Sequence, residues 1–205
     1  MNIAFTGAHG VGKTTVMGIV YDELLKEKLF ATTLGSATRD VLGWGRNDRN
    51  GNRVSVSPYS SSFQLACVYK RREWMLDSQL SKYDFVLSER WAFDEYIYQG
   101  ELMSRPLEDG LIQGGEDALN ILWEEACWEL QNYWDVVYWI PASNRPLSED
   151  GVRPQEKEFQ TRIDSLFSNA IENLRETGYT IKVLPNENLE EVRQYLKKEI
   201  QEWKK

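Results

Sequence analysis

The chain has 205 residues, with 24 Lys and Arg residues against 32 Asp and Glu residues and a formal net charge of -8. This length fits a single domain spanning residues 1–205, and the negative charge argues against sequence-independent binding along a nucleic acid. Cys67 and Cys127 form no zinc-binding or disulfide pattern, and no apolar run has membrane-spanning length. We therefore expect a cytoplasmic protein that makes no membrane contact.

Five apolar runs have the character of strands, and helical patterns lie between them. In chain order these runs are residues 2–6, 30–34, 84–88, 134–141 and 179–185. Their alternation with helices predicts an α/β fold in three layers, with about five parallel strands and helices on both faces. Polar stretches at 43–52, 104–115 and 142–154 are expected to form loops at the carboxyl edge of the sheet, where ligands bind.

Two of the helical patterns carry apolar stripes at three- and four-residue spacing, which we expect to face the core. The first stripe is Phe159, Ile163, Leu166, Phe167, Ala170, Ile171 and Leu174, and the second is Leu189, Val192, Leu196, Ile200 and Trp203. Before the second stripe, Asn188 and Glu191 have the spacing of a capping box, which predicts a helix start there.

A phosphate-binding motif follows the first strand directly. Residues 7–14 read GAHGVGKT, which matches the P-loop pattern G-x-x-x-x-G-K-[ST]. Lys13 is expected to contact the β- and γ-phosphates, and the Thr14 hydroxyl to ligate Mg²⁺. His9, the only histidine, is expected to fill the loop and not to act as a base. The predicted nucleotide-binding residues are Gly7, Ala8, His9, Gly10, Val11, Gly12, Lys13, Thr14 and Thr15.

The segment from Arg39 to Arg72 departs from the overall acidity. It contains seven cations and two acids, which gives a local charge of +5. We therefore expect an anionic substrate there. Aromatic residues also gather in and near this segment, and Phe63 and Trp91 are the best candidates to stack on a base.

An acid and a base follow the third predicted strand. Residues 84–94 read DFVLSERWAFD, so Glu89 and Arg90 lie where that strand ends. In a parallel sheet this exit falls beside the phosphate loop, where Glu89 can reach the Mg²⁺ shell and Arg90 the phosphates. A surface ion pair at the end of a strand is the alternative interpretation.

These motifs together resemble those of the thymidylate kinase-like group, which includes nucleoside monophosphate kinases, deoxynucleoside kinases and nicotinamide riboside kinase-like proteins. The resemblance implies ATP as the donor, Glu89 as the Mg²⁺-linked acid and Arg90 as a phosphate clamp. It also implies that Gln64 and Arg71 or Arg72 grip the base and phosphate of the acceptor. The residues that carry it are Phe63, Gln64, Arg71, Arg72, Glu89, Arg90, Asp94, Tyr98 and Gln99. We include Arg39, Asp40, Trp91 and Asp94 among the acceptor-site candidates.

A further match lies in residues 142–158, where Arg145 precedes the sequence DGVR at 150–153. The resemblance implies an arginine-bearing lid there, with Arg153 stabilising the transferring phosphoryl group and Arg145 contacting the nucleotide. Lid closure would exclude water from the reaction. A solvated loop with incidental arginines is the alternative.

The sequence differs from this group after the second strand, where it reads GSATRD at 35–40 and lacks the expected glutamate. Asp40 is the nearest carboxylate. A missing general base disfavours a hydroxyl acceptor more than a monophosphate, whose attacking oxygen is already anionic.

The sequence therefore predicts a Mg²⁺-dependent kinase that moves the γ-phosphate of ATP to a nucleotide, with a pyrimidine deoxynucleoside monophosphate preferred. One alternative acceptor is a hydroxyl of a nucleoside, a small metabolite or a hydroxymethylated pyrimidine in DNA. Another alternative is a nucleotide-dependent switch with no acceptor. A homodimer is compatible with the sequence.

Overall fold

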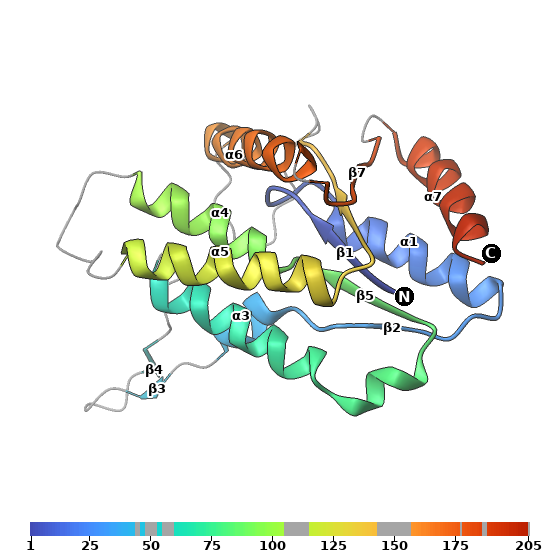
Figure 1. Cartoon of the computed structure of the whole chain (residues 1–205), viewed down its shortest axis with the longest axis horizontal. Helices are drawn as coiled ribbons and strands as arrows, with labels where there is room; N and C mark the ends of the chain where they lie inside the picture. Colours follow the sequence, from blue (N-terminus) through green and yellow to red (C-terminus); the bar gives the residue numbers. More distant parts are fainter. Residues whose placement is uncertain are drawn as a thin grey trace. The chain divides into compact units, whose positions relative to one another are not determined.

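The computed structural model describes residues 1–43, 60–104, 115–142, 157–176, 178–185 and 188–204, together with the backbone of 46–47 and 53–54. Figure 1 shows the described helices and strands. The chain divides into two compact units. The sheet unit comprises Met1–Thr33, Gln79–Arg90 and Tyr133–Lys205, and the helical unit comprises Leu34–Ser78 and Trp91–Asn132. That all 205 residues act as one domain stays a prediction.

The sheet unit is built on five parallel strands. They are β1 (Asn2–Thr6), β2 (Ala31–Thr33), β5 (Phe85–Glu89), β6 (Val136–Trp139) and β7 (Ile181–Val183), in the spatial order β2-β5-β1-β6-β7. The central strand β1 has Ile3, Ala4 and Phe5 fully buried, as expected for a parallel strand with neighbours on both edges. Each predicted apolar run contains a strand, so the α/β fold with parallel strands is confirmed.

Three helices belong to the sheet unit: α1 (Lys13–Lys26), α6 (Lys157–Glu176) and α7 (Leu189–Trp203). A 3₁₀ helix, η1 (Ser78–Lys82), precedes β5. Helix α1 packs against β1, β2, β5 and α7, while α6 packs against β7. The side chain of Asn188 accepts a hydrogen bond from the Glu191 N–H (2.8 Å), which confirms the predicted start of α7.

Most residues of the predicted stripes are core residues. In α6 the buried ones are Phe159, Ile163, Phe167, Ile171 and Leu174, and in α7 they are Val192, Leu196 and Ile200. Leu166 and Leu189 are 36% and 41% exposed, so the prediction that these two residues face the core is wrong. Leu189 is the first residue of α7, where a side chain has little of the helix beside it, and Leu166 lies at the edge of its stripe.

The helical unit contains α2 (Ala37–Leu42), α3 (Ser61–Met75), α4 (Ala92–Met103) and α5 (Gly115–Asn132). Helices α3, α4 and α5 pack against one another, and α2 packs against α3 around Ala37, Val41, Phe63 and Cys67. A short antiparallel pair is formed by β3 (Arg46–Asn47), which lies within the stretch 43–52 expected to be loop, and β4 (Arg53–Val54), which follows that stretch directly. Strands of two residues are too short for apolar alternation to reveal them.

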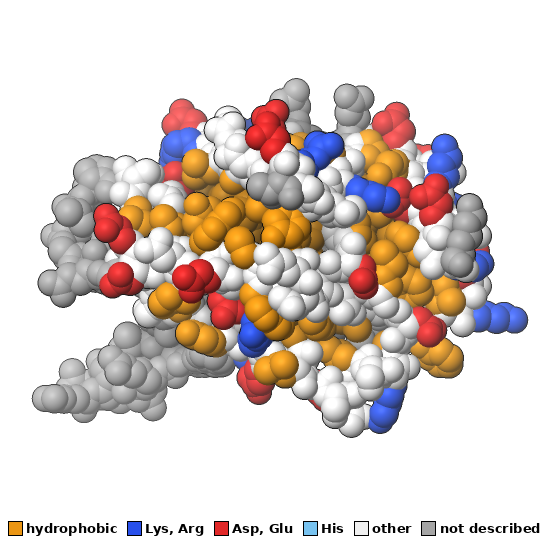
Figure 2. All heavy atoms as spheres, in the orientation of Figure 1, with side chains coloured by type: hydrophobic (Ala, Val, Ile, Leu, Met, Phe, Trp, Pro, Cys, Tyr) orange, Lys and Arg blue, Asp and Glu red, His pale blue; other side chains and the backbone are white. Residues whose placement is uncertain are grey.

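Within the described ranges, no helix combines the length and apolar character needed to cross a bilayer. Figure 2 shows acidic and basic side chains interspersed over the face in view.

Candidate functional site

Glycine residues permit the backbone conformation of the phosphate loop, residues 7–14. Gly7 and Gly12 have φ angles of 140° and 94°, in the region that side chains disfavour. A Cβ atom added at Gly7 would lie 2.4 Å from the carbonyl oxygen of Ile140, so no side chain fits there. Gly12 precedes α1 directly, and no side chain within the described ranges caps that helix. The loop therefore presents the N-terminal end of α1 to an anion.

Lys13 is 3% exposed and its ammonium group is held at the loop. Its Nζ donates hydrogen bonds to the carbonyl oxygens of Gly7 (2.8 Å) and Ala8 (2.7 Å). These two carbonyl oxygens hold the ammonium group against the backbone of the loop. The P-loop pattern requires a lysine at this position for contact with phosphate.

Thr14 and Glu89 meet although they lie on different elements. The hydroxyl of Thr14, an exposed residue in the first turn of α1, donates a hydrogen bond to Oε2 of Glu89 (2.6 Å), the last residue of β5. Hydroxyl and carboxylate oxygens are ligands that suit Mg²⁺, which usually takes few protein ligands and keeps water and phosphate oxygens. In the described part of the chain, no group of three or more His, Cys, Asp and Glu side chains is placed to hold a metal ion. The two predicted metal residues are thus adjacent.

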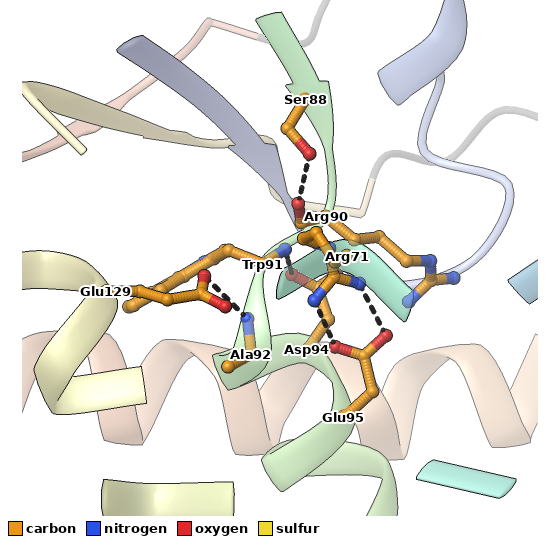
Figure 3. A network of polar contacts seen from close by, with 8 residues as sticks. All are labelled: Arg71, Ser88, Arg90, Trp91, Ala92, Asp94, Glu95 and Glu129. Carbon is orange, nitrogen blue, oxygen red and sulfur yellow. Dashed lines mark hydrogen bonds and ion pairs between the residues drawn. The ribbon is translucent and has the colours of Figure 1, made fainter. Parts of the chain in front are cut away.

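Arg90 has a strained backbone at the exit of β5. Its φ angle is 81°, which is unusual for any residue except glycine. The Ser88 hydroxyl donates to the Arg90 carbonyl oxygen (2.7 Å), as Figure 3 shows, and the Arg90 N–H donates to the carbonyl oxygen of Phe5 (2.9 Å). Phe5 is one residue before the end of β1 and pairs with Glu89. Strain held in this way is typical of functional positions, and it fixes Arg90 beside the strand that leads into the phosphate loop.

His9 is buried within the sheet unit, where its ring stacks on Phe159 with centroids 5.2 Å apart. Its carbonyl oxygen accepts a hydrogen bond from Nε2 of Gln160 (2.8 Å). Packing of this kind supports the expectation that His9 fills the loop. Gln160 was not among the predicted site residues, because its partner lies 151 positions away and no local pattern marks it.

The helical unit holds a buried ionic network around Arg71 (Figure 3). Arg71 is 2% exposed, and its two terminal nitrogens donate to the two carboxylate oxygens of Glu95 at 3.0 and 2.9 Å. Burial by itself lowers the pKa of the guanidinium, but the charges of Glu95 and Glu129 outweigh it and hold that pKa above its ordinary value. Arg71 is therefore a permanent cation that a carboxylate already balances.

Two further acids of this network, Asp94 on α4 and Glu129 on α5, accept hydrogen bonds from backbone N–H groups at the start of α4. Oε2 of Glu129 accepts from the Ala92 N–H (3.1 Å), and Oδ2 of Asp94 accepts from the Trp91 N–H (3.3 Å). Asp94 and Glu129 are both fully buried. Carboxylates are favourable at a helix N-terminus, where the backbone N–H groups lack helical partners. Neither Glu95 nor Glu129 was among the predicted site residues.

The remaining acceptor-site candidates occupy varied positions in the helical unit. Phe63, Gln64 and Trp91 are buried, whereas Arg39 and Asp40 on α2 are exposed. Arg72 pairs with Glu125 (2.8 Å) and lies over the ring of Trp128, 3.4 Å from its centroid. Arg145 and Arg153 lie outside the described residues. All predicted donor-site residues that are described belong to the sheet unit, and all predicted acceptor-site residues belong to the helical unit.

The first strand of the parallel sheet runs into a glycine-rich phosphate loop. A lysine and a threonine begin the helix that follows, and an acid ends the neighbouring strand. These features define a P-loop nucleotide-binding protein. Comparison with known proteins agrees with this class. The chain belongs to the family described as AAA domain, whose model matches residues 2–191.

A solved structure, thymidylate kinase from Ehrlichia chaffeensis, is similar over 98% of this chain and 98% of that chain, with a TM-score of 0.61 and 18% sequence identity. At this identity the likeness concerns the fold alone. No curated protein matches the chain. The predicted resemblance to P-loop kinases of the thymidylate kinase-like group is thus confirmed at the level of the fold.

Proposed function

We propose that the protein is a Mg²⁺-dependent kinase that transfers the γ-phosphate of ATP to a nucleotide, with a pyrimidine deoxynucleoside monophosphate as the preferred acceptor. The observation that carries this proposal is the hydrogen bond between Thr14 and Glu89, beside the buried ammonium group of Lys13. This hydrogen bond brings the two residues that we propose as Mg²⁺ ligands together at the end of the loop that we propose to bind phosphate, and all of these residues belong to the sheet unit.

The donor half of the reaction follows from these groups. The loop N–H groups and Lys13 would hold the phosphates of ATP, and Thr14 and Glu89 would hold Mg²⁺. The metal ion, when bound, neutralises phosphate charge. Arg90, with its backbone fixed at the exit of β5, would meet the charge that develops on the transferring group. We assign the same role to Arg153 and nucleotide contact to Arg145.

The acceptor half rests on the helical unit. We assign Phe63 and Trp91 to packing against a base, and Gln64 and Asp94 to bonding with its polar edge. All four side chains are buried, so these contacts require a movement within the helical unit that exposes them. The exposed Arg39 is the cation best able to meet an acceptor phosphate, because Arg71 is already paired with Glu95 and Arg72 with Glu125. A monophosphate brings its own anionic nucleophile, so this acceptor needs no general base, and Asp40 would serve only to bind the sugar.

The buried network also favours a second candidate. Arg71 is balanced by Glu95, and Asp94 and Glu129 are buried close by in the same network. Because Arg71 already has a carboxylate partner, it offers little to an acceptor phosphate, whereas an uncharged hydroxyl acceptor needs no such cation. The second candidate is therefore a kinase for a hydroxyl of a nucleoside, a small metabolite or a hydroxymethylated pyrimidine in DNA.

A coupled assay of ADP release would test both candidates. Purified protein, ATP and Mg²⁺ would be offered a panel of deoxynucleoside monophosphates and the matching nucleosides, and γ-labelled ATP would be offered DNA with and without hydroxymethylated bases. We expect acceptor-dependent turnover with monophosphates that is abolished by EDTA and by Lys13→Met. The variant Lys28→Met, which changes an exposed lysine after α1, is the matched control.

Turnover restricted to nucleosides or modified DNA would establish the second candidate in place of the first. Hydrolysis of ATP without dependence on any acceptor would contradict both and would indicate a nucleotide-dependent switch.

A further inference from the structure

We propose that Gln160 is a positioning residue for the phosphate loop, which fixes the orientation of the peptide bond between His9 and Gly10. This inference rests on the proposed use of the loop to bind nucleotide, and it assigns a new role to the first turn of α6. Gln160 lies 151 positions from His9, and both residues belong to the sheet unit.

The hydrogen bond from Gln160 determines which way the His9–Gly10 peptide group faces. A trans peptide is planar, and its C=O and N–H point in opposite directions. No cis peptide bond occurs in the described residues. Nε2 of Gln160 donates to the His9 carbonyl oxygen (2.8 Å), so this oxygen points toward α6. The N–H of Gly10 must then point away from α6, and we assign that direction to the phosphate-binding side of the loop.

The hydrogen bond from Gln160 matters because a glycine at position 10 does not by itself fix the orientation of the His9–Gly10 peptide group. Its φ angle is 73°, a conformation that glycine adopts at little cost and leaves as easily. A reversal of the His9–Gly10 peptide would replace an N–H donor with a carbonyl oxygen, which repels phosphate. The glycine thus permits the binding conformation, and the hydrogen bond from Gln160 selects it.

The amide of Gln160 is itself oriented. Nζ of Lys157 donates to Oε1 of Gln160 (2.8 Å). Because an ammonium group can only donate, Oε1 must face Lys157, and the NH₂ group must face the His9 carbonyl. Gln160 is 2% exposed, so water does not compete readily for its donor. The two hydrogen bonds therefore run in one direction, from Lys157 to Gln160 and from Gln160 to the His9 carbonyl oxygen.

Neighbouring contacts hold α6 at this place. Phe159 stacks on the His9 ring, with centroids 5.2 Å apart. One turn after Gln160, Oδ1 of Asp164 accepts from the Ala142 N–H (2.8 Å), three residues beyond the end of β6. Gln160 and Asp164 are four positions apart and therefore lie on the same face of the helix. That face is anchored both to the loop and to the chain leaving β6.

Gln160→Glu is the sharpest test, because it keeps the shape of the side chain and replaces the NH₂ donor with an acceptor facing the His9 oxygen. Asn169→Asp makes the same chemical change at an exposed position of α6 and is the matched control. Gln160→Met removes the donor without adding charge, which provides a second variant if the glutamate destabilises the protein. Circular dichroism and thermal unfolding would establish that each variant is folded.

Two readouts separate orientation from general damage. Calorimetry would measure binding of Mg-ADP and of Mg-tripolyphosphate, which has no nucleoside. We expect Gln160→Glu to weaken the binding of both ligands about tenfold or more, which is the scale of one lost hydrogen bond from the Gly10 N–H to a charged phosphate. Gln160→Met should weaken the binding of both by less. Because His9 is the only histidine, carbonyl-labelled His with amide-labelled Gly gives one resonance, that of the His9–Gly10 peptide. In the parent protein it should shift on addition of Mg-ADP.

The outcomes are distinct. If folded Gln160→Glu and Gln160→Met bind Mg-ADP as tightly as the Asn169→Asp control and retain the Gly10 shift, the positioning role is overturned. If the parent protein itself binds neither ligand, the proposed kinase function fails. In that case the Gly10 resonance of the free protein still tests the orientation, since the proposal requires it to move in Gln160→Glu and not in Asn169→Asp.

Discussion

The guanidinium of Arg71 and the carboxylate of Glu95 form a two-point ion pair between α3 and α4, at 3.0 and 2.9 Å, with both side chains removed from solvent. Breaking such a pair leaves an uncompensated charge in the interior, which is costly, although the intact pair adds little to stability. This relationship limits what Arg71 can offer an acceptor and also ties two helices of the helical unit together.

Removal of one partner of this pair should destabilise the protein strongly. We expect Arg71→Met or Glu95→Gln to lower the free energy of unfolding by about 3–5 kcal/mol, and Arg71→Met with Glu95→Met to cost less than the sum of the single changes. Chemical denaturation would measure this. Lys26→Met, which removes a 65% exposed partner of Glu23, is the control and should change stability by less than about 1 kcal/mol. Equal, additive effects at both sites would contradict the expectation.

The hydroxyl of Thr14 should determine how nucleotide binding responds to magnesium. We expect Thr14→Ala to reduce the gain in ADP affinity that Mg²⁺ confers by about tenfold or more, the scale on which groups around a metal act. Thr14→Ser retains the hydroxyl and should retain most of that gain. Calorimetric titrations with Mg²⁺ and with EDTA would measure the difference. If both variants responded to Mg²⁺ as the parent protein does, Thr14 would not be a metal ligand.

Two glycines should respond in opposite ways to the same substitution. Gly7→Ala places a Cβ against the backbone of Ile140 at a φ of 140°, and the strained φ alone should cost about 1–3 kcal/mol of stability. Gly18 lies within α1, where an added Cβ meets nothing within 4 Å. Gly18→Ala should therefore stabilise the protein by about 0.5–1 kcal/mol. Thermal unfolding of both variants, with opposite shifts in Tm expected, would check this.

The stability of the protein should depend on pH through Asp164. Burial raises the pKa of its carboxyl, although the hydrogen bond from Ala142 acts in the opposite direction. The native state then keeps this proton at a pH where the unfolded chain has lost it. The contribution to stability therefore falls as the pH rises from the ordinary pKa of 3.8 through the native pKa.

Asp164→Asn keeps an oxygen that can accept from Ala142 and removes the titration. We expect the variant to lose the fall in stability over that pH range and to equal or exceed the parent protein in stability above it. Denaturation curves at a series of pH values would show this. A parent protein that gains more stability than the variant as the pH rises through this range would contradict the assignment.

The elements that local sequence determines were predictable. Each strand of the sheet corresponds to a short apolar run, and the phosphate loop is recognisable because its residues are consecutive. The pairing of Thr14 with Glu89 followed from a rule of parallel sheets, in which neighbouring strands end at the same edge.

The roles of Glu95 and Gln160 could not be read from the sequence in this way. Glu95 is 24 positions from Arg71, and Gln160 is 151 positions from His9. The sequence around Glu95 or Gln160 contains no local pattern that distinguishes a buried, paired side chain from an exposed one on a helix. Only the packing of α3 with α4, and of α6 beside the phosphate loop, reveals these contacts.

The order of the two units along the chain limits how the protein can be divided into fragments. The polypeptide passes between the two units four times, after Thr33, Ser78, Arg90 and Asn132. A gene fragment that stops at Arg90 would encode the phosphate loop and Glu89 but not β6, the partner of β1 on its other edge. The sheet unit and the helical unit therefore cannot be exchanged between related proteins by a single crossover, and chimaeras need paired junctions at these boundaries.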